Sequence, residues 1–389
     1  MRLATRVQQL PPYLFARISE LIAEKRAEGV DVISLGIGDP DLPTPPHIIE
    51  ALQLAAEDPA NHRYPETEGL PEFREAVARW YERRHGVSLD PETEVVSLIG
   101  SKEGIGHLPL CLIDPGDLAI STSPGYPVYE VATMFAGGET LALPLREEDG
   151  WLPRLDEISD ADAARAQLLW LNYPNNPTGA IADHAFFERA VAWAKQHDIA
   201  IAHDLAYSDV CFDGYEAPSI LEVDGARDVA IEFNSLSKTF NMTGWRIAMA
   251  VGNADLVGVL RRVKSNLDSG VAQAVQQMAI AALDGPRDAI DGHNAIYQRR
   301  RDRAVEVLRE LGLHVDPPSA SLYVWARLPE GERSSADYAG RLVEETGVVV
   351  TPGVSYGDAG EGYIRISLTL GDDRLEEALD RLSRFARGQ

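Results

Sequence analysis

The segment from Ser235 to Arg246 reads Ser-Leu-Ser-Lys-Thr-Phe-Asn-Met-Thr-Gly-Trp-Arg, and it follows a short apolar run, Val229–Phe233. It places one lysine, Lys238, just after two serine hydroxyls and a short distance before an arginine. A lysine amine beside hydroxyl and guanidinium groups suits a Schiff base with pyridoxal phosphate, an aldehyde that carries a phosphate. The segment therefore predicts a pyridoxal phosphate site in which Lys238 binds the cofactor.

The other four lysines of the chain are weaker candidates for this role. Lys25 and Lys195 have charged, helical surroundings that are typical of solvated side chains, and Lys264 follows two arginines in a basic helical run. Lys102 also follows an apolar run, but it begins an expected helix and no arginine follows closely. Among the five lysines, Lys238 alone combines a loop setting with nearby hydroxyls and an arginine.

The composition is that of an acidic globular protein. The chain has 389 residues, of which 45% are hydrophobic and 25% charged, and its formal net charge is −25. This length predicts two or three domains, and the negative charge argues against binding nucleic acid through a basic surface. The sequence has no apolar run that predicts a membrane span, and its first residues do not resemble a signal peptide. We therefore expect a cytoplasmic protein that binds neither nucleic acid nor membrane.

Short apolar runs alternate with helical patterns between residues 93 and 253. The runs that we expect as buried strands are Val95–Ile99, Leu118–Ser121, Leu168–Leu171, Ile199–Ala202, Val229–Phe233 and Ile247–Val251. Buried strands separated by helices are typical of a mainly parallel α/β sheet with helices on both faces. Most of these runs end at a polar or glycine-containing cluster, and ligands bind beyond the carboxyl ends of such strands. We expect the clusters to converge on one site.

The sequence predicts three regions. Residues 46–286 form a large domain around this sheet, and residues 287–389 form a smaller α+β domain that begins with a charged helical pattern, Arg287–Leu311. Residues 1–45 contain an amphipathic helical pattern, Leu14–Glu28, and we expect this segment to pack on the small domain. The further elements expected in the small domain are strands Ser321–Ala326 and Tyr363–Leu368 and helices Ser335–Thr346 and Arg374–Arg387.

Two of the polar clusters offer groups that bind phosphate. Ser101 begins a helical pattern directly after a predicted strand, where free backbone N–H groups bind phosphate well. Ser235, Ser237 and Arg246 add hydroxyl and guanidinium donors for the same phosphate. On its own, the start of the helix also fits an ordinary cap.

Other clusters offer groups that bind the cofactor ring. Asp204 ends a predicted strand, and a carboxylate there can pair with the protonated pyridine nitrogen, which keeps the ring an electron sink. Tyr207 and Asn176 can reach the phenolic oxygen of the cofactor, and Tyr126 can stack on its ring. Each has a structural alternative as well: Asp204 as a helix cap, Asn176 as part of a turn, and Tyr126 as a core aromatic.

Taken together, the motifs resemble those of the class I/II aminotransferases of fold type I, in the same order and spacing. The matching motifs are Tyr173-Pro174-Asn175-Asn176-Pro177-Thr178-Gly179, Asp204-Leu205-Ala206-Tyr207, Ser235-Leu236-Ser237-Lys238, Arg246, and Arg365 within Tyr363-Ile364-Arg365-Ile366-Ser367. Each motif is weak alone, but five in register make a chance match very improbable. The resemblance implies a fold type I pyridoxal phosphate transferase with a mainly parallel central sheet and a smaller α+β domain.

The resemblance also implies a role for each residue. Lys238 would bind the cofactor and move the proton between the substrate Cα and the cofactor. Arg365 would bind the substrate α-carboxylate bidentately, and Gly38 would let the backbone approach that carboxylate. The cofactor would be held by Asp204 at the pyridine nitrogen, by Asn176 and Tyr207 at the phenolic oxygen, by Tyr126 against the ring, and by Ser101, Lys102, Ser235, Ser237 and Arg246 at the phosphate. In this family a tyrosine of the partner subunit reaches the phosphate, and Tyr64 fits that position, which implies a homodimer.

Further segments resemble the LL-diaminopimelate aminotransferases in particular. These segments are Tyr13-Leu14-Phe15, Gly36-Ile37-Gly38-Asp39, the stretch from Ser237 to Arg246, the stretch from Val263 to Gly270, and Tyr323-Val324-Trp325. Such enzymes transfer an amino group from glutamate to tetrahydrodipicolinate in lysine biosynthesis. The resemblance implies substrate contacts for Tyr13, Lys102 and Asn176.

One position departs from that pattern. Better-known members carry a glutamate that binds the distal ammonium of the substrate, whereas this chain has Thr67 there, with Glu66 and Glu68 on either side. Either a neighbouring glutamate replaces it or the specificity differs. The alternatives are an aspartate or alanine aminotransferase of broad specificity and a pyridoxal phosphate C–S β-lyase.

The sequence gives little support for two other classes of protein or for a metal site. We do not expect a transcription regulator built on the same domain, because no helix-turn-helix pattern precedes Gly38. We do not expect a nucleotide-binding enzyme either, because no Gly-x-Gly-x-x-Gly follows a first strand. The histidine spacing does not predict a metal site.

Overall fold

The large domain is built on a seven-stranded sheet with the strand order β2-β8-β7-β6-β5-β3-β4. This computed structural model describes residues 2–10 and 14–387. The strands are β2 (Val95–Leu98), β3 (Leu118–Ser123), β4 (Glu139–Pro144), β5 (Ala166–Asn172), β6 (Ala200–Asp204), β7 (Ala230–Ser235) and β8 (Ala248–Gly252). Within this sheet β8 runs antiparallel to both of its neighbours, and the other described pairings are parallel. The predicted mainly parallel sheet is therefore confirmed.

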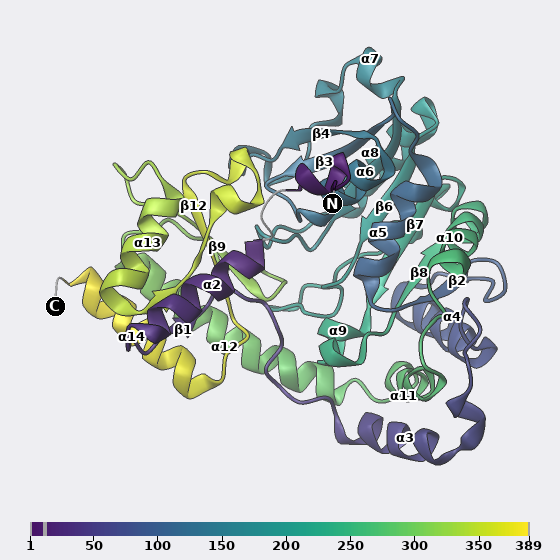
Figure 1. Ribbon diagram of the computed structural model, residues 1–389, viewed down its shortest axis with the longest axis horizontal. Helices are drawn as coiled ribbons and strands as arrows, with labels where there is room; N and C mark the ends of the chain where they lie inside the picture. Colours follow the sequence, from purple (N-terminus) through teal and green to yellow (C-terminus); the bar gives the residue numbers. More distant parts are fainter. Residues whose placement is uncertain (1, 11–13, 388–389) are drawn as a thin grey trace.

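Helices pack on both faces of this sheet, and each face has its own apolar core. The helices of one face are α4 (Pro71–His85), α8 (His184–His197) and α11 (Gln273–Leu283). The helices of the other face are α5 (Ser101–Leu112), α6 (Val128–Ala136) and α10 (Ala254–Leu267). Figure 1 shows α3 (Pro46–Glu57) alongside α11 at the lower edge of this domain. Burial on both faces explains why most of these strands read as apolar runs in the sequence.

The sequence did not predict β4. This strand lies at the edge of the sheet, where it pairs with β3 alone, and most of its residues keep some exposure to solvent. It begins with Glu139 and ends with Pro144, which is compatible with an edge strand and not with a central one. Its sequence therefore lacks the continuous apolar character by which the buried strands were recognised.

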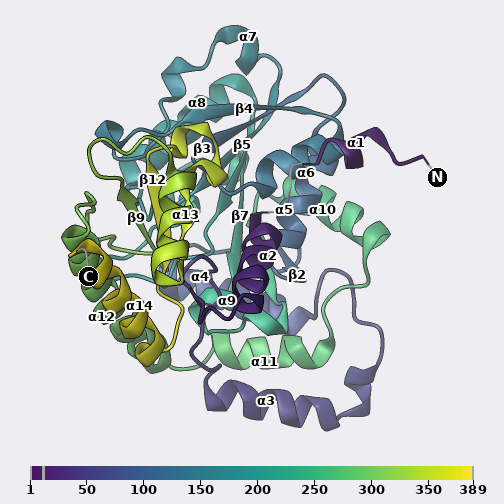
Figure 2. The same cartoon turned by 60° about the vertical axis from the view of Figure 1, so that its left-hand side comes forward.

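The small domain has a three-stranded antiparallel sheet in the order β11-β12-β9. Its elements are β9 (Tyr323–Arg327), β11 (Thr351–Pro352), β12 (Tyr363–Ser367), α12 (Asp288–Glu310), α13 (Ser335–Thr346) and α14 (Asp372–Ala386). Figure 2 shows α12 and α14 side by side on the outer face of this domain. Apolar side chains of these helices and of β9 and β12 share one core, which also takes in Tyr207, Val210 and Phe212 of the large domain.

The N-terminal segment packs on the small domain. Strand β1 (Ile33–Ser34) pairs in parallel with β10 (Val348–Val349), and Leu35 O accepts a hydrogen bond from Ser367 N at 2.7 Å. Ile18, on α2 (Leu14–Ala27), lies in a small apolar cluster with Val343 and Val349. These contacts hold the backbone of residues 36–38 beside β12.

Two further short helices are α1 (Thr5–Gln8) and α7 (Asp160–Ala163). Among the described residues, the helices are all too short or too polar to cross a membrane.

Candidate active site

A cavity of about 490 Å³ lies where the carboxyl ends of β5, β6 and β7 meet the start of α5. The predicted site residues that line it are Gly38, Ser101, Lys102, Tyr126, Asn176, Asp204, Tyr207, Ser235, Ser237, Lys238 and Arg246. They come together because parallel strands present their carboxyl ends at one edge of the sheet. The clusters that follow the strands in sequence thus converge in space.

One end of the cavity gathers groups that bind anions. Gly100, the N-cap of α5, has a left-handed backbone with φ of 77°, and a Cβ on it would overlap the guanidinium of Arg246. Arg246 therefore lies directly against the start of α5, where backbone N–H groups lack intrahelical partners. Ser235 caps the short helix α9 (Leu236–Thr239), and its Oγ accepts a hydrogen bond from Ser237 N at 3.1 Å. Guanidinium, hydroxyl and helix start together form an anion-binding cradle.

A buried carboxylate lies on another wall of the cavity. Asp204 Oδ2 accepts a hydrogen bond from Tyr129 OH at 2.8 Å, whereas its Oδ1 is buried without a hydrogen-bond partner. Burial raises the pKa of Asp204 to about 6, although the bond from Tyr129, the charge of His203 and the N–H of Ala206 act in the opposite direction. A buried acceptor without a donor is costly, so this oxygen is suited to a ligand that donates a hydrogen bond.

Lys238 lies between the anion-binding end and the N-terminal segment. Its Nζ donates a hydrogen bond to Gly38 O at 2.8 Å. Burial lowers the pKa of Lys238, and the positive charges of Arg365 and Arg246 lower it further, while Tyr323 and Asp39 oppose this shift. A lowered pKa increases the neutral fraction of the amine, which is the nucleophilic form.

Arg365, on β12, joins three segments that are distant in sequence. Its Nη1 donates to Asn176 Oδ1 at 2.9 Å and its Nη2 donates to Gly36 O at 2.7 Å. The guanidinium is fully buried, and its Cζ lies 3.8 Å from the ring centre of Tyr323. Tyr323 lines the cavity and Arg365 does not, so Tyr323 covers the arginine in this structure.

Tyr323 and Tyr129 are site residues that the sequence analysis missed. Tyr207 OH donates to Tyr323 OH at 3.3 Å. Burial alone would raise the pKa of Tyr323, but the charges of Arg365 and Lys238 outweigh it and lower the pKa. Tyr129 follows Tyr126 by three residues on α6, a helical spacing that could have indicated it. Tyr323 had no comparable local signal, because its position depends on the pairing of β9 with β12.

Besides Arg365, one further predicted residue within the described part of the chain, Tyr64, does not line this cavity. Tyr64 is 88% exposed and borders a different hollow, together with Ser269 and Gly270. The loop after it, which contains Thr67, packs on Gly270, since a Cβ on that glycine would lie 2.9 Å from Glu66 O. Tyr13 lies outside the described residues. The role of Tyr64 therefore remains a prediction about a partner subunit.

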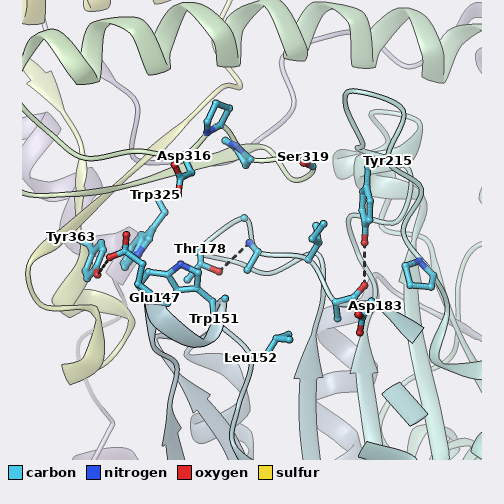
Figure 3. Close-up of a pocket in the computed structure, with 18 of the residues that line it drawn as sticks. Glu147, Trp151, Leu152, Thr178, Asp183, Tyr215, Asp316, Ser319, Trp325 and Tyr363 are labelled. Carbon is cyan, nitrogen blue, oxygen red and sulfur yellow. Dashed lines mark hydrogen bonds between the residues drawn. The ribbon is translucent and has the colours of Figure 1, made fainter. Parts of the chain in front are cut away.

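A larger cavity of about 650 Å³ lies behind the segment that carries Asn176 (Figure 3). Figure 3 shows Trp151, Trp325 and Tyr363 gathered on one side of it with Glu147. Tyr363 OH donates to Glu147 at 2.9 Å, so a loop of the large domain is fastened to β12. The described residues that line this cavity include no lysine, which leaves the smaller cavity as the candidate active site.

Comparisons with known proteins agree with this geometry. Residues 30–382 match the family model described as aminotransferase class I and II. The LL-diaminopimelate aminotransferase of Dehalococcoides mccartyi is 58% identical over 385 residues, which cover 99% of each chain. The solved structure of substrate-bound BacF from Bacillus subtilis has a TM-score of 0.95 and 38% identity, covering 99% of this chain and 98% of that one. A mutant aspartate aminotransferase of Thermus thermophilus has a TM-score of 0.91 and 32% identity, covering 99% of this chain and all of the other (100%).

Proposed function

Since this chain belongs to the aminotransferase class I and II family, we propose that it is an LL-diaminopimelate aminotransferase that depends on pyridoxal phosphate. It would exchange an amino group between glutamate and tetrahydrodipicolinate in lysine biosynthesis. The observation that carries this proposal is the 58% identity to a protein of that name over 99% of both chains.

The described residues fit pyridoxal phosphate. The buried Asp204 Oδ1 lacks a donor, which a protonated pyridine nitrogen would supply. The cradle formed by Arg246 and the start of α5 suits the phosphate, and Lys238 lies between the two with a lowered pKa. When bound, the cofactor supplies an aldehyde that condenses with amines and a ring that withdraws electrons.

The chain's own residues would then bind and orient the substrate and move its proton. Lys238 would accept the proton that leaves the substrate Cα and would return it to the cofactor. Asn176 and Tyr207 would fix the ring through its phenolic oxygen. For Arg365 to bind the α-carboxylate, Tyr323 must leave its place over the guanidinium, because it covers that group here.

The proposal includes a homodimer. Tyr64 is a large, exposed aromatic residue that does not line its own cavity, and a partner subunit would bring it to the phosphate. The same loop would place Glu66 or Glu68 near the distal ammonium of LL-diaminopimelate, where Thr67 cannot pair with a charge.

A substrate screen tests the proposal. The purified enzyme, loaded with cofactor, is mixed in turn with LL-diaminopimelate, glutamate, aspartate and alanine, and the loss of the yellow absorbance of the bound cofactor is followed. We expect rapid loss with LL-diaminopimelate and glutamate and slow loss with the other two. Preference for aspartate or alanine would instead indicate an aminotransferase of broad specificity. Release of pyruvate and ammonia from a substrate with a β-sulfur would indicate a C–S β-lyase.

A further inference from the structure

His203 lies one residue before Asp204 on β6, and its side chain is fully buried. Its Nδ1 lies 2.8 Å from Glu232 Oε2, and its Nε2 lies 3.1 Å from Tyr173 O. A carbonyl oxygen can only accept a hydrogen bond, so the contact with Tyr173 requires a proton on Nε2. The state of Nδ1 then depends on Glu232.

Glu232 is surrounded by donors. Its Oε1 accepts from Tyr81 OH at 2.9 Å and from Ser219 Oγ at 2.8 Å, and its Oε2 accepts from Ile220 N at 3.0 Å. Burial would raise the pKa of Glu232, but the hydrogen bond and charge of His203, with smaller contributions from the charge of His85 and the hydroxyl of Ser219, outweigh it and lower the pKa. Glu232 Oε2 accepts a hydrogen bond from the backbone N–H of Ile220, and it is also the oxygen that faces Nδ1 of His203. Both ring nitrogens of His203 therefore face acceptors, and a neutral ring would leave one lone pair against an oxygen.

The two contacts of His203 join elements on which the proposed cofactor residues lie. Tyr173 begins the segment 173–179, which carries Asn176, while His203 and Glu232 are directly paired on β6 and β7. A second tie runs alongside, because Asn172 Nδ2 donates to Asp204 O and Asn172 Oδ1 accepts from Asn176 N, both at 2.8 Å. His203 thus holds the start of the segment and Asn172 holds its middle.

We propose that His203 is a doubly protonated positioning residue, with Glu232 as its counter-ion, which fastens the segment 173–179 to the strand that carries Asp204. The positive ring lies on the opposite face of the sheet from the cavity, since it packs against Phe187 of α8 whereas Asp204 contacts Tyr129 of α6. From there its charge favours the ionised form of Asp204. The effect on the cofactor rests on the proposed function, whereas the charge state of His203 does not.

The ionisable groups around His203 do not compete for its proton. Tyr81, on α4, donates to Glu232, and His85, on the same helix, pairs with Glu222 through Nδ1 at 2.8 Å. His85 is a useful comparison because it is also buried and also paired with a glutamate, but its Nε2 has no acceptor. Its geometry therefore does not require a second ring proton.

Nitrogen NMR of the holoenzyme tests the charge state directly. The nine histidines are labelled with ¹⁵N, and the His203 signals are assigned by their loss in His203→Gln or, should that variant not fold, by ring-proton contacts to Phe187. We expect both ring nitrogens of His203 in the protonated range at pH 7, whereas a neutral ring would show one unprotonated nitrogen. An unprotonated ring nitrogen at pH 7 would overturn the proposal.

Hydrogen exchange in variants tests the positioning role. In His203→Gln we expect the amides of Asn176, Thr178 and Gly179 to exchange at least tenfold faster, because the start of their segment is no longer held. In Glu232→Gln the increase should be smaller, because a neutral His203 can still donate from Nε2 to Tyr173 O. The comparison variant His85→Gln removes a neighbouring buried histidine that pairs with Glu222 rather than with the segment 173–179, and it should leave these amides unchanged. Equal exchange in all three variants would overturn the positioning role.

The absorbance of the bound cofactor tests the proposed influence of His203 on it separately. In Glu232→Gln the pH at which its absorbance changes should shift relative to the native enzyme, while in His85→Gln it should not. If the absorbance titration does not shift but His203 is protonated, the proposed influence of His203 on the cofactor is wrong. The proposed charge of His203 would then still stand. Failure of LL-diaminopimelate as a substrate would affect the proposed function alone, because neither the NMR signals nor the exchange rates depend on substrate.

Discussion

Asp204 combines an energetic cost with a function. Its carboxylate is buried, one of its oxygens has no donor, and its pKa is raised to about 6 from 3.8. A raised pKa means that the folded chain holds this proton more tightly than the unfolded chain does. Stability is therefore lost as the pH rises from about 4 to about 6, and the loss is complete above that range. On the proposed function, this cost would leave a carboxylate ready to pair with the cofactor ring.

We expect Asp204→Asn to stabilise the cofactor-free protein and to weaken cofactor binding. A shift of about two pH units corresponds to roughly 3 kcal/mol, which is the upper limit for the gain in the free energy of unfolding at pH 8. Chemical denaturation of both proteins between about pH 4 and pH 8 checks this, and the gain should grow up to about pH 6 and then stay constant. Cofactor affinity should fall at least tenfold. A variant that is less stable at pH 8 would contradict the proposed cost.

Replacing Lys238 tests its proposed roles in binding the cofactor and in moving the proton. Lys238→Ala should lose the yellow absorbance of the covalently bound cofactor and reduce turnover by at least about 10³-fold, because both the nucleophile and the proton carrier are gone. Absorbance spectra and a transamination assay measure the two effects. The control is Lys195→Ala, which removes an exposed lysine paired with Asp228 and should change neither. Full activity in Lys238→Ala would exclude this lysine from the reaction.

The start of α5 shows how a helix, a strand and a loop share one task. Gly100 follows β2 and takes a left-handed backbone, which lets α5 begin with its N–H groups toward the cavity. The absence of a side chain there leaves room for the guanidinium of Arg246. Arg246 comes from the turn after α9, so the anion-binding end depends on the packing of two separate elements.

We expect Gly100→Ala to disrupt this end of the cavity selectively. The new Cβ would both overlap Arg246 and strain the backbone, because a φ of 77° with a ψ of 149° is nearly confined to glycine and costs on the order of 1–3 kcal/mol for other residues. Affinity for pyridoxal phosphate should fall at least tenfold, whereas pyridoxal without its phosphate should bind nearly as before. Gly116→Ala is the matched control, since Gly116 also has a positive φ but its surroundings are open. Equal losses for both ligands would place the phosphate elsewhere.

The elements that could be predicted from the sequence were those with a strong periodic signal. Helix Ser335–Thr346 matches α13, and the long pattern from Arg287 matches α12 within a residue at each end. Edge strand β4 was not predicted, because its partial exposure to solvent interrupts the apolar run. The convergence of the strand-end clusters could be predicted, because each cluster directly follows its strand in the sequence. The position of Tyr323 over Arg365 could not be predicted, since it depends on which strands pair in the small domain.

The proposed homodimer is the largest unit on which the active site would depend. Each site would combine Lys238 of one chain with Tyr64 of the other, so the two residues can be separated genetically. We expect a mixture of Lys238→Ala and Tyr64→Ala chains, refolded together, to recover activity above the sum of the two separate variants. Random pairing predicts up to about a quarter of the native number of sites. The transamination rate of the mixture measures this.

Two outcomes of the mixing experiment would argue against the shared site. Full activity in Tyr64→Ala alone would exclude the tyrosine, and the absence of recovery in the mixture would mean that both residues serve the same chain's cavity. As a control, Lys238→Ala mixed with Tyr215→Ala should show only the activity of the second variant, because Tyr215 lines the other cavity.

The order of the site residues along the chain has a consequence for synthesis on the ribosome. All strands of the large sheet lie between residues 95 and 252, and the proposed cofactor residues of that chain end at Arg246. The arginine proposed for the substrate, Arg365, is made almost last and then joins Gly36, one of the first residues to emerge. A growing chain can therefore form the cradle for its cofactor well before it can recognise an amino acid. If the cradle fills at that stage, Lys238 would already be occupied when Arg365 joins Gly36.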